Sequence, residues 1–290
     1  MKSTLLSLIQ PAFVVLVVLF WSLAPAAIVE SAAAPIIVSC LILAAIQALE
    51  FVLERHEGWR INRREFLTDA FYVALNMSVI DTASKLLADD PLKALKGSLG
   101  IVTPWTEHLP IAVQIALAVF LIELGQYWMH RLMHNSLLWW THAPHHHITQ
   151  LNALKGAVGN PLELFLISLS VVALFDFKLN ALLGAGSVLT VIAAFAHANL
   201  RFVPPRWYSF FFTTIEHHSL HHSVPYEDTL CNYANCLILC DRVFGTFRSG
   251  EASVVGQDDR RRLSIREQFQ YPMLPLLAWW KGRRGEQPAV

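Results

Sequence analysis

The chain has 290 residues, of which 54% are hydrophobic and 15% charged, with a mean hydropathy of +0.44. An ordinary soluble domain carries about 25% charged residues, so this composition favours a protein with much of its surface inside a membrane. Basic and acidic residues both number 22, and the resulting zero net charge argues against a nucleic-acid partner. Thirteen histidines against four cysteines point to imidazole as a metal ligand or proton carrier.

Two apolar segments open the chain. Residues 3–29 contain no charged side chain, and residues 31–49 form a second charge-free run. Each meets the requirement of about 20 residues for a membrane-spanning helix. The first also resembles a secretory signal, but its apolar run exceeds the usual length of about 7–15 residues, so we expect a retained anchor. Residues 54–69 then carry four arginines, which predicts that this loop lies in the cytoplasm.

Four further segments are candidates for membrane helices. Residues 70–88 form a weaker candidate that would run outward, and residues 109–129 form an apolar segment that would return. Residues 164–175 are too short to cross alone, whereas residues 179–200 are long enough, so this pair predicts a full or re-entrant hairpin.

Histidines recur in three short motifs. The first is an HxxxH pair, and the second and third are HxxHH motifs. In HxxHH the first and last residues share a helix face, while the middle one is rotated by about 100° and can point to a second metal. Imidazole sets suit Zn, Cu, Fe or Ni, and eight such ligands are appropriate for two ions. The eight are His130, His134, His142, His145, His146, His218, His221 and His222.

Other polar residues are candidates for supporting roles. A metal-binding histidine usually donates its second N–H to a carboxylate or carbonyl. Candidates for this role, with helix capping or solvation as the alternative, are Glu123, Asn199, Glu216, Asp228, Asn232 and Asp241. His197 stands alone at the end of an apolar run, and its spacing alone favours a structural role. The sequence identifies no catalytic acid or base.

These motifs resemble the fatty acid hydroxylase/sterol desaturase superfamily. The resemblance extends over about residues 109–247 and includes Asn232-Tyr233 and the run from Asp241 to Phe247. It implies a membrane oxygenase with two histidine-bound iron ions on the cytosolic side, O₂ as co-substrate and an external reductant. It makes ligands of the eight motif histidines, and His197-Ala198-Asn199 resembles the family's H-x-N motif, which adds His197 as a ninth.

The function that this resemblance implies is hydroxylation or desaturation of a lipid at an unactivated C–H bond, with the lipid entering from the bilayer. The sequence shows no GxGxxG after a strand and no iron–sulfur cysteine set. Electrons are therefore expected from a reductase with a ferredoxin or a cytochrome b5-like protein.

Three alternatives belong to other classes. A metal transporter would place its ligands near the membrane midplane, and a haem protein would need single axial histidines on facing helices. Both fit the clustered motifs poorly. A non-catalytic protein that keeps zinc for structure has the same ligand set and stays open.

The expected fold is an all-α integral membrane protein with four to six transmembrane or re-entrant helices and a cytosolic histidine-rich cap. We divide the chain into an N-terminal transmembrane region (residues 1–108), a catalytic domain (109–250) and a cytosolic or interfacial tail (251–290). Oligomeric state does not follow from the sequence.

Overall fold

A computed structural model describes residues 2–283, so the last seven residues of the expected tail lie outside the described residues. All the regular elements of this part are helical, and its β pairing is limited to two isolated bridges, Glu54 with Leu200 and Ser223 with Val255. The prediction of an all-α protein is confirmed.

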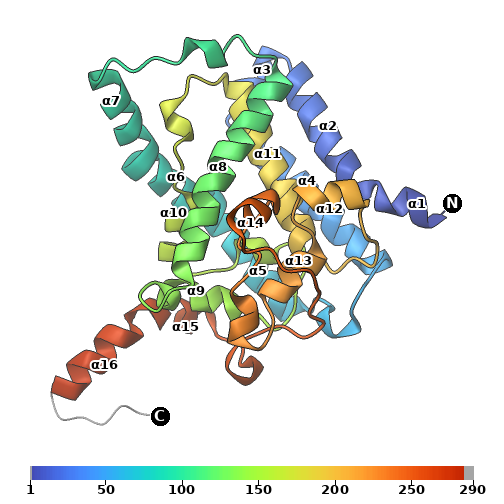
Figure 1. Ribbon diagram of the computed structural model, residues 1–290, viewed down its shortest axis with the longest axis vertical. Helices are drawn as coiled ribbons and strands as arrows, with labels where there is room; N and C mark the ends of the chain where they lie inside the picture. The colour runs from blue at the N-terminus through green and yellow to red at the C-terminus, as the bar shows by residue number, and fades with distance from the viewer. Residues whose placement is uncertain (1, 284–290) are drawn as a thin grey trace.

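Long apolar helices form the upper part of the molecule (Figure 1). They are α2 (Ile9–Leu23), α4 (Ala34–Val52), α8 (Ile111–Met133) and α11 (Leu179–His197), preceded or joined by the short α1 (Lys2–Ser7) and α3 (Ala26–Val29). Helices α4, α8 and α11 are long and apolar enough to cross a membrane, whereas α2 has 15 residues. Their outward side chains are apolar, as a lipid-facing surface requires.

Helix α11 lies at the centre of this bundle and packs against α2, α4 and α8. Gly184 allows the close approach, because a Cβ atom there would lie 2.5 Å from Cδ1 of Ile115 and 3.3 Å from Cβ of Trp21. The Trp21 indole donates a hydrogen bond of 2.8 Å to Ser187 Oγ on the same helix, so its one polar atom is satisfied within the apolar core.

A helical run longer than the predicted segment 70–88 follows the arginine-rich loop. It contains two π-helical segments, and such segments occur often at functional sites. Its parts are α5 (Arg63–Leu75), η2 (Asn76–Ile80), α6 (Asp81–Ser84), η3 (Lys85–Asp89) and α7 (Asp90–Ser98). The run ends near the top of the molecule, where Lys96 pairs with Asp176.

The segment predicted as too short to cross alone is only partly helical. Helix α10 (Pro161–Ser168) gives way to extended backbone and then to the 3₁₀ turn η6 (Val172–Leu174). Gly125 of α8 makes room for this backbone, since a Cβ atom there would lie 3.1 Å from the Leu169 carbonyl oxygen. One side of the non-helical stretch therefore packs against α8, while Val171 is exposed.

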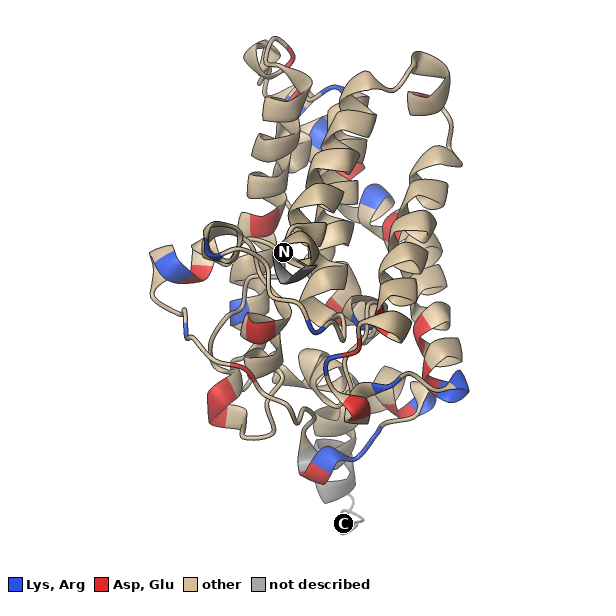
Figure 2. Cartoon of the chain, turned by 90° about the vertical axis from the view of Figure 1, so that its right-hand side faces the viewer, with Lys and Arg blue, Asp and Glu red and all other residues tan. Residues whose placement is uncertain are grey.

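Short helices and loops form the lower part. They are α9 (Trp139–His146), α12 (Arg206–Phe211), α13 (Ile215–His221), α14 (Leu239–Phe244), α15 (Ile265–Gln270) and α16 (Leu274–Arg283), with 3₁₀ turns at Glu57–Trp59, Lys155–Ala157, Tyr226–Thr229, Asp258–Arg260 and Tyr271–Met273. A further 3₁₀ turn, Pro104–Thr106, lies at the top, in the connection between α7 and α8 (Figure 1). Figure 2 shows most of the charged residues here, while the long helices above carry few. This distribution places the histidine-bearing end outside the apolar layer.

Candidate metal centre

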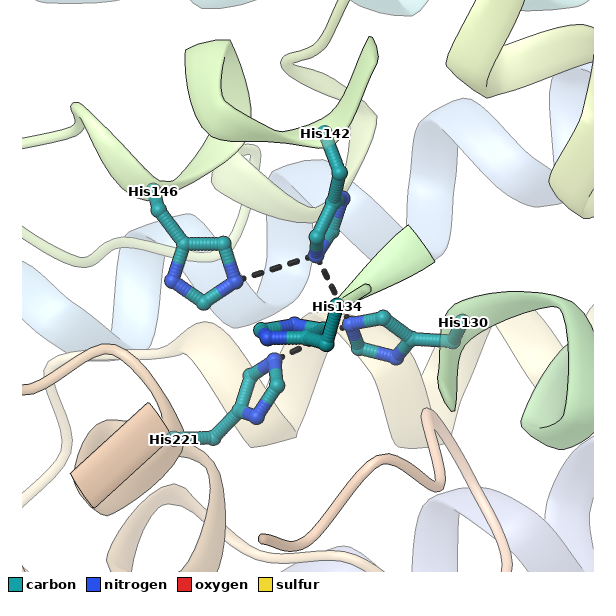
Figure 3. Close-up of side chains that lie close together, drawn as sticks. All are labelled: His130, His134, His142, His146 and His221. Atoms are coloured by element: carbon teal, nitrogen blue, oxygen red, sulfur yellow. Dashed lines mark hydrogen bonds between the residues drawn. The ribbon is translucent and has the colours of Figure 1, made fainter. Parts of the chain in front are cut away.

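Five histidines converge where the lower end of α8 meets α9 and α13. His130 belongs to α8 and His134 directly follows that helix. His142 and His146 belong to α9, and His221 belongs to α13. One nitrogen of each ring lies within 4.8 Å of the corresponding nitrogens of the others, and all five side chains are buried. Figure 3 shows the rings pointing toward one another. We call this set the five-histidine group.

Four more histidines form a second set beside it. They are His145 of α9, His197 at the end of α11, His218 of α13, and His222, which directly follows α13. Their ring nitrogens lie within 4.8 Å of one another, and all four side chains are buried. We call this set the four-histidine group. His197 thus lies with the motif histidines and not alone at a helix end.

Each of the two HxxHH motifs contributes histidines to both groups. His142 and His146 enter the five-histidine group while His145, between them, enters the other. In the third motif His221 likewise joins the five-histidine group, and its neighbours at 218 and 222 join the other. The division follows the rotation expected for a middle histidine. That each group holds a metal stays a prediction.

Ring nitrogens of neighbouring histidines lie at hydrogen-bonding distance from one another. Nε2 of His130 is 2.9 Å from Nε2 of both His142 and His221, and in the other group Nε2 of His218 is 2.9 Å from that of His197. The Nδ1 atoms of His130 and His142 face oxygen acceptors, which places the hydrogen on Nδ1 and leaves a lone pair on Nε2.

A cation resolves this crowding of lone pairs. Two imidazole nitrogens bound at right angles to one ion at about 2.1 Å would be about 3 Å apart, which matches the observed separations. His134 adds a further sign, because within the described residues neither of its ring nitrogens has a hydrogen-bond partner. The donor set therefore fits one transition-metal ion in each group.

Main-chain carbonyl groups accept a hydrogen bond from Nδ1 of four of the nine rings. The Nδ1 atom of His130 donates to Tyr233 O (2.5 Å), and that of His221 to Cys231 O (2.7 Å). In the four-histidine group, His145 donates to Val158 O at 2.6 Å and His197 to Ala193 O at 2.8 Å. These contacts fix both the tautomer and the ring orientation.

Burial keeps the imidazoles neutral. It lowers the pKa of His145 to about 4 and that of His221 to about 3. Burial, followed by the neighbouring histidines, also lowers the pKa of His134, His142, His146, His218 and His222 well below the usual range. Since a metal binds the neutral ring, these histidines need no deprotonation at neutral pH.

Glu163 is the carboxylate that supports a ring, and the sequence reasoning missed it. Its Oε1 atom accepts from His142 Nδ1 at 2.7 Å, while Oε2 accepts from the Asn160 backbone N–H at 3.1 Å. Asn160 and Glu163 form a capping box at the start of α10. The pattern Asn-x-x-Glu before an apolar run was the available signal, although it indicates a helix start and not a metal site.

Within the described residues, none of the predicted supporting residues is hydrogen-bonded to one of the nine rings. Asp241 accepts from the backbone N–H groups of Tyr233 and Ala234. Asn232 (φ +53°) accepts from the Arg248 N–H. Both therefore shape the turn whose carbonyls hold His130 and His221.

The remaining candidates have other roles. Glu123 accepts from the Cys236 N–H (3.0 Å), and Asn199 accepts from the His56 N–H (2.8 Å). Asp228 pairs with Arg248 at the surface, and Glu216 pairs with Arg55. His56, in the same loop as Arg55, contacts Glu251 at 2.9 Å.

A cavity of about 400 Å³ reaches both histidine groups. Its inner end is lined by His130 and His142 of one group and His145 and His197 of the other. From there it extends between α4, α5, α8, α10 and α11, with apolar walls that include Leu43, Val73, Leu164 and Leu189. An apolar molecule in this cavity would lie beside both groups.

Comparison with known proteins gives a consistent result. Residues 115–246, which include all nine histidines, match the family model described as fatty acid hydroxylase. The chain is similar to the ornithine lipid hydroxylase OlsE of Rhizobium tropici, with 26% identity over 217 residues. The alignment covers 71% of this chain and 65% of that relative, so it spans slightly under two thirds of the relative's length. No solved structure matches the chain.

Proposed function

We propose that the chain belongs to the fatty acid hydroxylase superfamily, whose family model matches residues 115–246, and that it is a membrane-bound di-iron hydroxylase of a lipid substrate. The observation that carries the proposal is the cavity, because it is largely apolar and ends at both histidine groups. A substrate C–H bond at its inner end would face both metals, and the rest of the lipid would extend toward the bilayer.

The reaction consumes one O₂ and two electrons. In balanced form, R–H, O₂, two electrons and two protons give R–OH and water. The iron ions, when bound, supply the oxidising chemistry that an unactivated C–H bond requires. The protein holds them with neutral imidazoles, and it fixes the rings through carbonyls and Glu163. The apolar walls exclude water and orient the chain of the substrate.

The relative's name favours a polar membrane lipid as substrate and hydroxylation as the reaction. OlsE is named as a hydroxylase of ornithine lipid, and the family model is likewise named for hydroxylation. We extend to this chain the class that these names share, which is a lipid with an acyl chain, and we prefer hydroxylation to desaturation.

Electrons would come from a separate donor, which we propose is a reductase with a ferredoxin or a cytochrome b5-like protein. We also propose that the histidine end faces the cytosol. In support, Arg60 in the loop that follows α4, and Arg63 and Arg64 at the start of α5, are exposed at that end, and basic segments beside membrane helices are retained in the cytoplasm.

The test measures iron and zinc per chain together with O₂-dependent lipid oxidation in protein purified from membranes. We expect about two iron ions per chain and a product that requires both O₂ and reductant. His145→Ala should lower both metal content and product, whereas His108→Ala, at an exposed position outside both groups, should change neither. Bound zinc without any oxidised lipid would instead favour the non-catalytic alternative.

A further inference from the structure

The cavity contains a carboxylate that has no counter-charge. Asp81, the first residue of α6, lines the cavity and is exposed, so it lies where the cavity meets the outside of the bundle. Lys85 follows one turn later but forms no ion pair with it, and within residues 2–283 the Asp81 carboxylate has no hydrogen-bond partner.

The position makes an unpaired charge costly. Helix α6 packs against α10, which packs against the spanning helix α8, and Figure 1 shows α6 at the height of α8. Its neighbours Val79, Leu86 and Leu87 are apolar and exposed. An ionisable side chain beside such a surface is expensive unless it has a partner, and it commonly marks a substrate site.

Most other polar groups of the cavity are already occupied. Asn76 donates to the carbonyls of Tyr72 and Ala157, and Thr190 donates to Gly186 O. Gln126 of α8 is an exception, since it lines the same cavity without a side-chain partner in the part of the chain that the structure describes. Besides Glu163, which is bonded to His142, the cavity therefore offers the Asp81 carboxylate and the side-chain amides of Gln126 and Asn235, for which the described residues provide no side-chain partner.

We propose that Asp81 binds the ammonium group of an amine-bearing lipid, with Gln126 as a second polar contact, while the lipid's oxidised carbon lies at the histidines. This inference rests on the proposed function and adds the chemical class of the substrate. A volume of about 400 Å³ is near the lower end of ligand pockets, which are about 300–1,000 Å³. It suits a head group and the adjoining part of a chain, with the remainder of the lipid in the bilayer.

The experiment measures equilibrium binding to the full chain in nanodiscs, so that its readout is independent of turnover. The probes are N-palmitoyl putrescine, which carries a free ammonium group, and its N′-acetyl derivative, which is neutral. We expect the wild type to bind the amine about tenfold or more tightly, and Asp81→Asn to remove this preference without weakening the neutral probe. Asp90→Asn, an exposed acid outside the cavity, is the matched control.

Equal binding of both probes by the wild type, or an undiminished preference in Asp81→Asn, would overturn the inference. Excess soluble putrescine should fail to displace the lipid, because the cavity walls need an acyl chain; full displacement would indicate a site for soluble amines instead. Failure of the proposed function looks different, since it would leave this binding preference in place and give no oxidised product.

Discussion

His142 and Glu163 are joined by a hydrogen bond of 2.7 Å between Nδ1 and Oε1, with both side chains buried. The same carboxylate closes the capping box of α10, so a helix start and a ring of the metal centre share one residue. Helix α10 also lines the cavity through Leu164 and Ile167. Glu163 therefore links the ring of His142, a predicted metal ligand, to the helix that lines the cavity.

Loss of this carboxylate should weaken metal binding. We expect Glu163→Ala to lower metal affinity about 10–100-fold, because His142 loses the acceptor that fixes its ring. Glu163→Gln keeps an acceptor oxygen and the capping geometry, so its effect should be smaller. Competition with a chelator gives the affinities, and Glu227→Gln at an exposed position is the control. Equal affinities for wild type and Glu163→Ala would contradict this role.

The division of each HxxHH motif between the two groups predicts which histidine variants have the same metal-binding defect. His145→Ala and His222→Ala, in different motifs, should share one defect because both remove a ligand from the four-histidine group. His146→Ala and His221→Ala should share a second defect. Metal content and the optical spectrum of the iron-loaded protein would distinguish the two classes. Variants that instead sort by sequence motif would show that the grouping is wrong.

Two glycines of α11 should respond to alanine in opposite ways. Gly184→Ala places a methyl group 2.5 Å from Cδ1 of buried Ile115, and such overpacking costs about 1–3 kcal/mol. Gly186 has open space around its Cβ position, so Gly186→Ala should stabilise the helix by about 0.5–1 kcal/mol. Thermal unfolding in detergent measures both. A lower melting temperature for Gly186→Ala than for Gly184→Ala would refute the packing argument.

Asp176 should make stability depend on acid pH. Hydrogen bonds from Lys96, and then from Thr103, lower its pKa to about 2 from the ordinary value of 3.8. Because the native pKa lies below the unfolded value, the carboxylate stabilises the fold above about pH 4, and this contribution disappears as the pH falls through 2. The difference in stability between wild type and Asp176→Asn should therefore shrink over this range. A difference that stays constant from pH 5 to pH 2 would argue against the ion pair.

The spacing within each HxxHH motif predicts that the middle histidine points away from the other two, because a short helix fixes the direction of each ring relative to its neighbours. The rings of α9 and α13 satisfy that rule independently. His197 shows the limit of such reasoning. Its ring lies beside His218 only because α11 ends next to α13, a contact that depends on tertiary packing.

The supporting contacts were largely beyond prediction for the same reason. Glu163 lies 21 residues from His142, and their contact depends on how α10 packs beside α9. Carbonyl groups hold four other rings, and a carbonyl leaves no signal in the sequence because every residue has one. The predicted acids were near in sequence, but Asp241 and Glu123 bind backbone N–H groups instead.

The most direct test of the account follows oxygen from O₂ into lipid. Membranes containing the wild type or His145→Ala are supplied with reductant and isotopically heavy O₂, and their lipids are analysed by mass spectrometry. We expect a hydroxylated lipid that carries one heavy oxygen atom in the wild type and is absent in the variant. Absence of such a lipid from iron-loaded wild type, or an oxygen atom derived from water, would contradict it.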